Sequence, residues 1–189
     1  NMAEEKAKVE EEAKAEASAP EADACAGFGA VAEEDGLPDL RFEERVTSTN
    51  DVAIDAAREG APHGWAVCAA EQTAGRGRRG HAWTSPAGSL YLSVVLHPQV
   101  RMQEFTALPA VCAMGVMDVL RAHGLGERVG IKWPNDIVAR AAANGGAAPF
   151  DRKLAGILVE AKAGAKGPVA VVGLGVNLQP LAVEGSGSA

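Results

Sequence analysis

The chain has 189 residues, of which 47% are apolar and 4% aromatic, and its formal net charge is −7. This composition is ordinary for a soluble globular protein. We find no apolar run long enough to cross a membrane and no signal-peptide pattern, so the sequence argues against a membrane protein and a secreted protein.

The negative charge is concentrated at the N-terminal end. Residues 1–39 hold twelve acidic and three basic residues, whereas residues 40–189 hold thirteen acidic and fifteen basic ones. The first segment is rich in Ala and Glu and lacks a wide apolar stripe, so we predict a disordered acidic tail and linker. Residues 40–189 are expected to form one domain. Cys25, Cys68 and Cys112 are odd in number and widely spaced, which favours the reducing cytoplasm.

The first predicted helix covers residues 51–59, directly after a short run of hydroxyl and amide side chains. Ser48, with Asp51 three residues later, resembles a capping box, and Gly60 suits the position after the last turn. The helix would then present its first backbone N–H groups and hydroxyls to an anion or a polar ligand. Plain N-capping is the alternative interpretation, although it needs only one of the two neighbouring hydroxyls.

A loop of three glycines and three arginines follows a predicted buried strand over residues 65–70. The loop reads Gly75-Arg76-Gly77-Arg78-Arg79-Gly80. Glycine lets the backbone approach a ligand closely, and arginine supplies forked, permanently charged donors for carboxylate and phosphate. The loop could handle two anions together, or it could be a solvated basic loop or an RNA-binding patch. The segment occurs once and lies between predicted strands, which favours the first interpretation.

The middle of the chain predicts a strand over residues 89–96 and a long helix over residues 103–123, which Gly124 can end. One face of the strand consists of Leu90, Leu92, Val94 and Leu96. On or near the buried stripe of the helix we expect Phe105, Leu108, Val111, Cys112 and Val119.

The last third of the chain predicts strands only. Residues 130–138 indicate two short strands interrupted at Pro134, and residues 154–160 and 169–178 indicate a hairpin. Side chains alternate between the two faces of a strand, so one face of the second strand carries Gly173, Gly175 and Asn177. A face with so few side chains could be the floor under a planar ligand, or it could belong to a twisted strand packed under a helix. Strands outnumber helices, so we predict an α+β fold with a mixed, mainly antiparallel sheet flanked by helices.

Six segments of the chain resemble, in the same order, the motifs of the catalytic domain of biotin protein ligases. They are residues 48–50, 72–80, 83–91, 132–136, 153–160 and 173–177. One such motif is a weak signal, but six in the family's order are a specific one. The resemblance covers about residues 45–178 and implies the fold of class II aminoacyl-tRNA synthetases.

The resemblance implies a two-step ligation. Biotin and ATP first form biotinyl-5′-AMP and pyrophosphate, and Mg²⁺ accompanies the nucleotide. The acyl group then passes to a lysine of a biotin carboxyl carrier protein, such as a subunit of acetyl-CoA carboxylase. The resemblance also implies a cytoplasmic monomer or homodimer, with neither nucleic acid nor a membrane as a partner.

The same resemblance assigns side chains to the two substrates. Lys153 and Arg78 would be the catalytic cations where the carboxyl and phosphate groups meet. Biotin would be bound by Ser48, Thr49, Asn50, Gln72, Arg76, Gly77, Arg78 and Lys153. ATP and the adenylate would be bound by Arg78, Arg79, Trp83, Lys132, Asn135, Asp136 and Asn177. Asp136 could instead cap the turn after Pro134, and Lys132 could be a solvated lysine, so the direct magnesium ligands stay unassigned.

The chain departs from the family's pattern in three places. Residues 139–152, rich in Ala and Gly, are expected to be a surface insertion. There is no N-terminal winged helix, so a repressor role is not supported. The sequence stops soon after Asn177, where members usually continue into a helix and a small β-barrel, so we expect a catalytic domain truncated at its C-terminal end.

Three other functions compete with biotin ligation. A lipoate or octanoate ligase is the nearest, because it shares the general fold, but the arginine loop and residues 132–136 favour biotin. A non-catalytic binder of biotin or nucleotide is the second alternative. A nucleic-acid binder, based on the arginine cluster alone, is the third.

Overall fold

The computed structural model describes residues 40–140, 150–164 and 167–178. The predicted tail, most of the predicted insertion and the C-terminal end therefore lie outside the described residues. In chain order the elements are β1 (Leu40–Val46), α2 (Thr49–Arg58), β2 (Ala66–Gln72), η2 (Arg78–Gly80), β3 (Leu90–Leu96), η3 (Met102–Ala107), α3 (Leu108–Ala122), η4 (Gly126–Arg128), β4 (Val129–Lys132), β5 (Asp136–Arg140), β6 (Phe150–Gly164) and β7 (Gly167–Val176).

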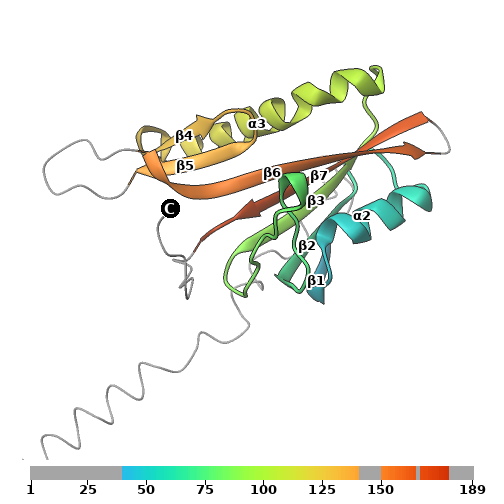
Figure 1. Cartoon of the computed structure of the whole chain (residues 1–189), viewed down its shortest axis with the longest axis horizontal. Helices are drawn as coiled ribbons and strands as arrows, with labels where there is room; N and C mark the ends of the chain where they lie inside the picture. The colour runs from blue at the N-terminus through green and yellow to red at the C-terminus, as the bar shows by residue number, and fades with distance from the viewer. Residues whose placement is uncertain (1–39, 141–149, 165–166, 179–189) are drawn as a thin grey trace, which may run out of the picture. The chain divides into compact units, whose positions relative to one another are not determined.

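The strands of the described part form one seven-stranded sheet in the order β1-β2-β3-β7-β6-β5-β4. β1 pairs with β2 in parallel, and each of the other neighbouring pairs is antiparallel. β6 and β7 form the long hairpin that runs through the middle of the sheet (Figure 1). The predicted α+β fold with a mixed, mainly antiparallel sheet is confirmed.

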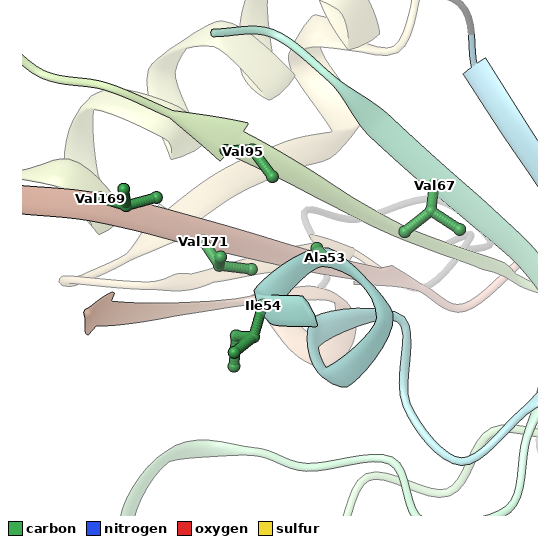
Figure 2. Packing of buried hydrophobic residues seen from close by; sticks show 6 residues of the cluster. All are labelled: Ala53, Ile54, Val67, Val95, Val169 and Val171. Atoms are coloured by element: carbon green, nitrogen blue, oxygen red, sulfur yellow. The ribbon is translucent and has the colours of Figure 1, made fainter. Parts of the chain in front are cut away.

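α2 packs on one face of this sheet. Ala53 and Ile54 of the helix meet valines of β2, β3 and β7 in a buried cluster (Figure 2). The valines are Val67, Val95, Val169 and Val171. Because α2 has only ten residues, it covers only part of this face.

α3 packs on the opposite face, where the even-numbered side chains of β7 point (Figure 1). Its fully buried residues are Ala113 and Met117. They contact side chains of β6 and β7 that include Ala155, Ile157 and Val172. The odd-numbered residues of β7 therefore face α2, as the period of two requires.

The predicted long helix is split, and part of its predicted buried stripe is wrong. Residues 102–107 form a 3-10 helix, and α3 begins at Leu108 with Pro109 in its first turn. Phe105 is buried, but Val111 and Val119 are about 60% exposed. Proline has no N–H and suits a helix start, and the tighter 3-10 turns before it shift the phase of the stripe.

The segment Met102–Ala122 is long and apolar enough to span a membrane by length and composition alone, with a mean hydropathy of 1.4. This contradicts the expectation that no apolar run reaches that length. The structure divides the segment into η3 and α3 and packs one side of α3 against the sheet. Its apolar residues therefore contribute to the core of this domain.

Two methionines three residues apart test which side of α3 faces the sheet. Met117 is 4% exposed and Met114 is 60% exposed. We expect Met117→Ala to lower the free energy of unfolding by about 2–5 kcal/mol, because it leaves a cavity. Met114→Ala is the matched control and is expected to change it by less than about 0.5 kcal/mol. Urea denaturation measures both, and equal losses would contradict the described packing.

Candidate active site

Three glycines leave the α2 side of the β6–β7 hairpin bare beyond the end of the helix. A methyl group on Gly173 would collide with Oδ1 of Asn50. One on Gly175 would lie 2.6 Å from Nε1 of Trp83, and one on Gly156 would lie 2.8 Å from the same indole. The glycines predicted to share a face do so, and the side chains of Asn50 and Trp83 lie directly over them.

The start of α2 is held by a side chain from another strand. Ser48 occupies the N-cap position, but it makes no side-chain cap hydrogen bond. The N–H of Thr49 instead donates to Oε1 of Gln72 at 2.8 Å. Asp51 binds an arginine, so the predicted capping box is wrong. A β2 side chain thus satisfies one of the first N–H groups of the helix, which have no partner within the helix itself.

Two serines without a predicted role of their own hold the polar residues of this pocket. Ser93 of β3 is fully buried and its Oγ donates to Oδ1 of Asn50 at 2.6 Å. Nε2 of Gln72 donates to Oγ of Ser85 at 2.9 Å. The sequence signal for Ser93 was a polar residue in a strand whose neighbours on both faces are apolar. A buried hydroxyl needs a partner, and here the partner is a predicted ligand-binding residue.

Arg76 is bound by two carboxylates. Its guanidinium donates two hydrogen bonds to Asp51, at 2.7 and 2.8 Å, and one to Oε2 of Glu160 at 3.1 Å. The hydrogen bonds to Asp51, and then the one to Glu160, raise the pKa of Arg76 above its ordinary value. Burial acts in the opposite direction but is outweighed. Glu160 also accepts a hydrogen bond from Nδ2 of Asn50 at 2.8 Å. Burial raises the pKa of Glu160, but the bonds from Asn50 and Arg76 outweigh burial and hold it below its ordinary range.

Arg78 and Lys153 meet adjacent residues at the start of β5. Nη1 of Arg78 donates to Oδ1 of Asn135 at 2.6 Å. Nζ of Lys153 lies 2.9 Å from Oδ1 of Asp136 and 4.9 Å from the centre of the Trp83 ring. Arg78 is thus held by a neutral amide, whereas Lys153 is held by a carboxylate and an aromatic face.

Most of the predicted site residues share one pocket. The inner pocket is lined by all the predicted biotin-binding residues, namely Ser48, Thr49, Asn50, Gln72, Arg76, Gly77, Arg78 and Lys153, and by Trp83 and Asn135. This inner pocket is narrow, about 50 Å³. Arg79 and Asp136 line an adjoining cleft of about 470 Å³, which also contains Arg78, Trp83 and Lys153.

Two predicted residues lie outside both cavities. Lys132 ends β4 and is exposed. Asn177 donates through Nδ2 to the backbone carbonyl of Lys153 at 3.1 Å, and its buried Oδ1 has no partner among the described residues. Asn177 therefore contacts the backbone of a predicted catalytic residue rather than the pocket itself. The indole N–H of Trp83 is likewise buried without a partner in the described part of the chain.

The described residues hold no group of three or more His, Cys, Asp or Glu side chains that could bind a metal. Asp136 is the carboxylate that lines the adjoining cleft. Lys153 and Asn135 both contact its Oδ1. Its second oxygen fits the way Mg²⁺ is often held, through one or two carboxylates together with substrate phosphates.

Comparison with known proteins agrees with this geometry. The model of the biotin/lipoate A/B protein ligase family matches residues 42–177. The chain belongs to this family. It is 43% identical over 136 residues to the biotin–[acetyl-CoA-carboxylase] ligase of Paracoccus denitrificans, covering 71% of the chain and 52% of that protein. It is 39% identical to the bifunctional ligase/repressor BirA of Escherichia coli, covering 75% of the chain and 41% of that protein.

Solved structures of family members share the fold. The biotin protein ligase of Leishmania major in complex with biotin matches with a TM-score of 0.59 and 34% identity, over 76% of this chain and 57% of that one. The enzyme of Aquifex aeolicus in complex with biotin and ATP matches with a TM-score of 0.55 and 30% identity, over 75% and 53%. The chain spans about half the length of the family members that it matches.

Gly173 offers a test of the bare strand face. In Gly173→Ala the new methyl group displaces the buried amide of Asn50, which breaks its bonds to Ser93 and Glu160. We expect a loss of about 1–3 kcal/mol in the free energy of unfolding. Gly115→Ala in α3 is the matched control, because nothing lies within 4 Å of the added methyl group. It should stabilise the helix by up to about 1 kcal/mol. Chemical denaturation compares them, and an unharmed Gly173→Ala protein would refute the described contact.

Proposed function

We propose that this chain carries the catalytic part of a biotin protein ligase, which activates biotin with ATP and transfers it to a protein lysine. The main support is the neighbourhood of Arg78 and Lys153. The two cations come from a loop and from β6, far apart in sequence, yet the adjacent residues Asn135 and Asp136 bind them both. They face the pocket that the predicted biotin-binding side chains line.

The inner pocket suits the ureido head of biotin. A ureido group has N–H donors and a carbonyl acceptor, so hydroxyls and an amide can match both. Ser48, Thr49 and Gln72 bring such groups to the pocket wall. The hydrogen bonds of Gln72 to Thr49 and Ser85 fix these groups before any ligand arrives. Binding then needs little reorganisation of the protein.

In the adenylation step, a carboxylate oxygen of biotin attacks the α-phosphorus of ATP. A new bond forms between them, the bond from that phosphorus to the β-bridging oxygen breaks, and pyrophosphate leaves. Two anions at about 4 Å repel each other by about 4 kcal/mol at an effective dielectric constant near 20. Arg78 and Lys153 offset this repulsion where the inner pocket meets the adjoining cleft, which both of them line. Catalysis then rests on positioning and electrostatics.

The adjoining cleft suits the nucleotide. Arg79 and Asp136 line it together with the exposed indole of Trp133. Magnesium, which neutralises phosphate charge when it is bound, would be held by Asp136 and the phosphates. Lys132 and Asn177 stand outside the cleft, so we assign them no direct contact with the nucleotide.

In the transfer step, the amine of an acceptor lysine attacks the carbonyl carbon of biotinyl-5′-AMP. The amide bond forms, the bond to the phosphate oxygen breaks, AMP leaves and the amine loses its proton. We propose a biotin carboxyl carrier protein as the acceptor and the cytoplasm as the compartment. The names of the relatives, which include biotin–[acetyl-CoA-carboxylase] ligase, support this acceptor class.

The family includes lipoate ligases, and two observations favour biotin over lipoate. The relatives at 39–43% identity bear names of biotin ligases or of ligase/repressors. Hydroxyl and amide side chains form part of the wall of the inner pocket, and they suit a ureido ring better than the apolar dithiolane ring of lipoate.

A comparison of the two vitamins by thermal shift tests this choice. Biotin at about 100 times its Kd should raise the melting temperature by roughly 5–10 °C. Lipoate at the same concentration should leave it within about 1 °C, because it cannot use the polar wall. A larger shift with lipoate would move the proposal to the lipoate branch, and no shift with either would point to another function.

Arg78→Ala and Lys153→Ala test the catalytic roles. Each should lower the rate of biotin-dependent pyrophosphate release from Mg-ATP by on the order of 100-fold or more, because each removes one preorganised charge. Arg121→Ala is the control, since Arg121 is exposed on α3 and forms its ion pair with Asp118, outside the pocket. Near-normal rates in both pocket variants would show that the charges act elsewhere.

A further inference from the structure

The first arginine of the glycine-arginine loop differs from the second in its partners. Arg76 bridges Asp51 in the first turn of α2 and Glu160 in β6. Among the described residues, Arg78 donates to the neutral amide of Asn135. The charge of Arg76 is thus offset by two carboxylates, one of which also pairs with Lys162. Arg76 is therefore poorly suited to attract a substrate anion.

Glu160 also fixes the orientation of Asn50. The amide oxygen of Asn50 accepts from Ser93, and its Nδ2 donates to Glu160. These two partners cannot be exchanged, because a carboxylate only accepts and so requires the NH₂ group. Asn50 is 4% exposed, and Gly173 leaves it just enough room. The rotamer and the orientation of this amide are thus set from three sides.

We propose that Glu160 and Asp51 are positioning residues that clamp Arg76 and Asn50 in the wall of the pocket. The inference rests on the proposed function and extends it to the orientation of the vitamin. Arg76 and Asn50 line the inner pocket, and the two carboxylates act through them without lining it themselves. The clamp keeps the polar end of the pocket beside α2 in one arrangement for the neutral head of biotin, and Arg78 and Lys153 remain for its anionic tail.

The charges around Glu160 are consistent with a permanently ionised carboxylate. Arg76 lies 3.1 Å away and Lys162 of the same strand lies 3.6 Å away. Asp51 reaches the cluster through Arg76. The clamp ties the loop to two separate elements, because Asp51 belongs to α2 and Glu160 to β6. Within the loop, the N–H of Gly77 donates to the carbonyl of His81, and the N–H of Trp83 donates to the carbonyl of Gly75.

The main test is Glu160→Gln, which keeps the shape of the side chain and removes its charge. We expect KM for biotin to rise by about 10-fold or more, since the bonds from Arg76 and Asn50 lose their charged acceptor. The kcat value should change by less than about 3-fold, because uniform binding rather than transition-state stabilisation is lost. Asp118→Asn, which breaks an exposed ion pair on α3, is the matched control and should change neither value.

A readout without ligand separates the clamp from the proposed function. Trypsin cleaves after arginine, so release of the loop should speed cleavage after Arg78 and Arg79 several-fold in Glu160→Gln. Asp51→Asn should do the same, and it remains available if Glu160→Gln fails to fold, since the Asp51 side chain is 44% exposed.

The outcomes decide between the claims. Unchanged loop cleavage and unchanged KM in both variants would overturn the clamp. Faster cleavage with an unchanged KM would overturn the orienting role, and a fall in kcat at constant KM would place Glu160 in the chemical step instead. If the wild-type chain fails to bind biotin, the proposed function fails, whereas the cleavage rates still decide whether the clamp exists.

Discussion

The arrangement of the site depends on holding two cations, Arg78 and Lys153, in the wall of the same pocket. Like charges near each other repel, and the protein supplies each cation with a partner on the adjacent residues Asn135 and Asp136 at the start of β5. Asn135 and Asp136 can serve both because β5 pairs with β6, which brings Asp136 opposite Gly156 and near Lys153. The sheet register thus places the partners of both cations. The amide that binds Arg78 is neutral, so the positive charge of Arg78 stays available to a ligand. The carboxylate that binds Lys153 offsets part of the positive charge of Lys153.

The glycines of β6 and β7 make this geometry possible. A strand in the middle of a sheet gains little from glycine, which weakens it and leaves nothing to pack. Here the missing side chains let Asn50 and Trp83 lie close to the backbone of the sheet. On the other face of the same strands, Val172 and Ile157 pack against α3 and supply the stability that the bare face lacks. One hairpin therefore serves as core on one face and as pocket floor on the other.

Much of the fold and of the pocket could be predicted from the sequence, because the signals were local or followed a known order of motifs. The strand alternation in β3 and β7, the glycine face and the strand break at Pro134 needed only neighbouring residues. The split of the predicted helix at Pro109 and the exposure of Val111 were missed, since a 3-10 turn shifts the phase without an obvious sequence signal. The capping box failed for a different reason. Asp51 matched a local motif, but Arg76 of a distant loop competes for the same carboxylate.

The partners of Arg76 also show why a motif alone cannot assign chemical roles. Arg76, Arg78 and Arg79 lie within four positions and carry the same charge, and the sequence treats them alike. In the fold, Arg76 is bound by two carboxylates, Arg78 by an amide, and Arg79 takes a left-handed backbone conformation with φ of 56° at the edge of the cleft. Electrostatic attraction of a substrate depends on the net charge within a few ångströms. Two carboxylates offset the charge of Arg76, whereas the partner of Arg78 is a neutral amide. Three identical side chains thereby divide into an anchor, a proposed catalytic cation and a cation at the rim of the cleft.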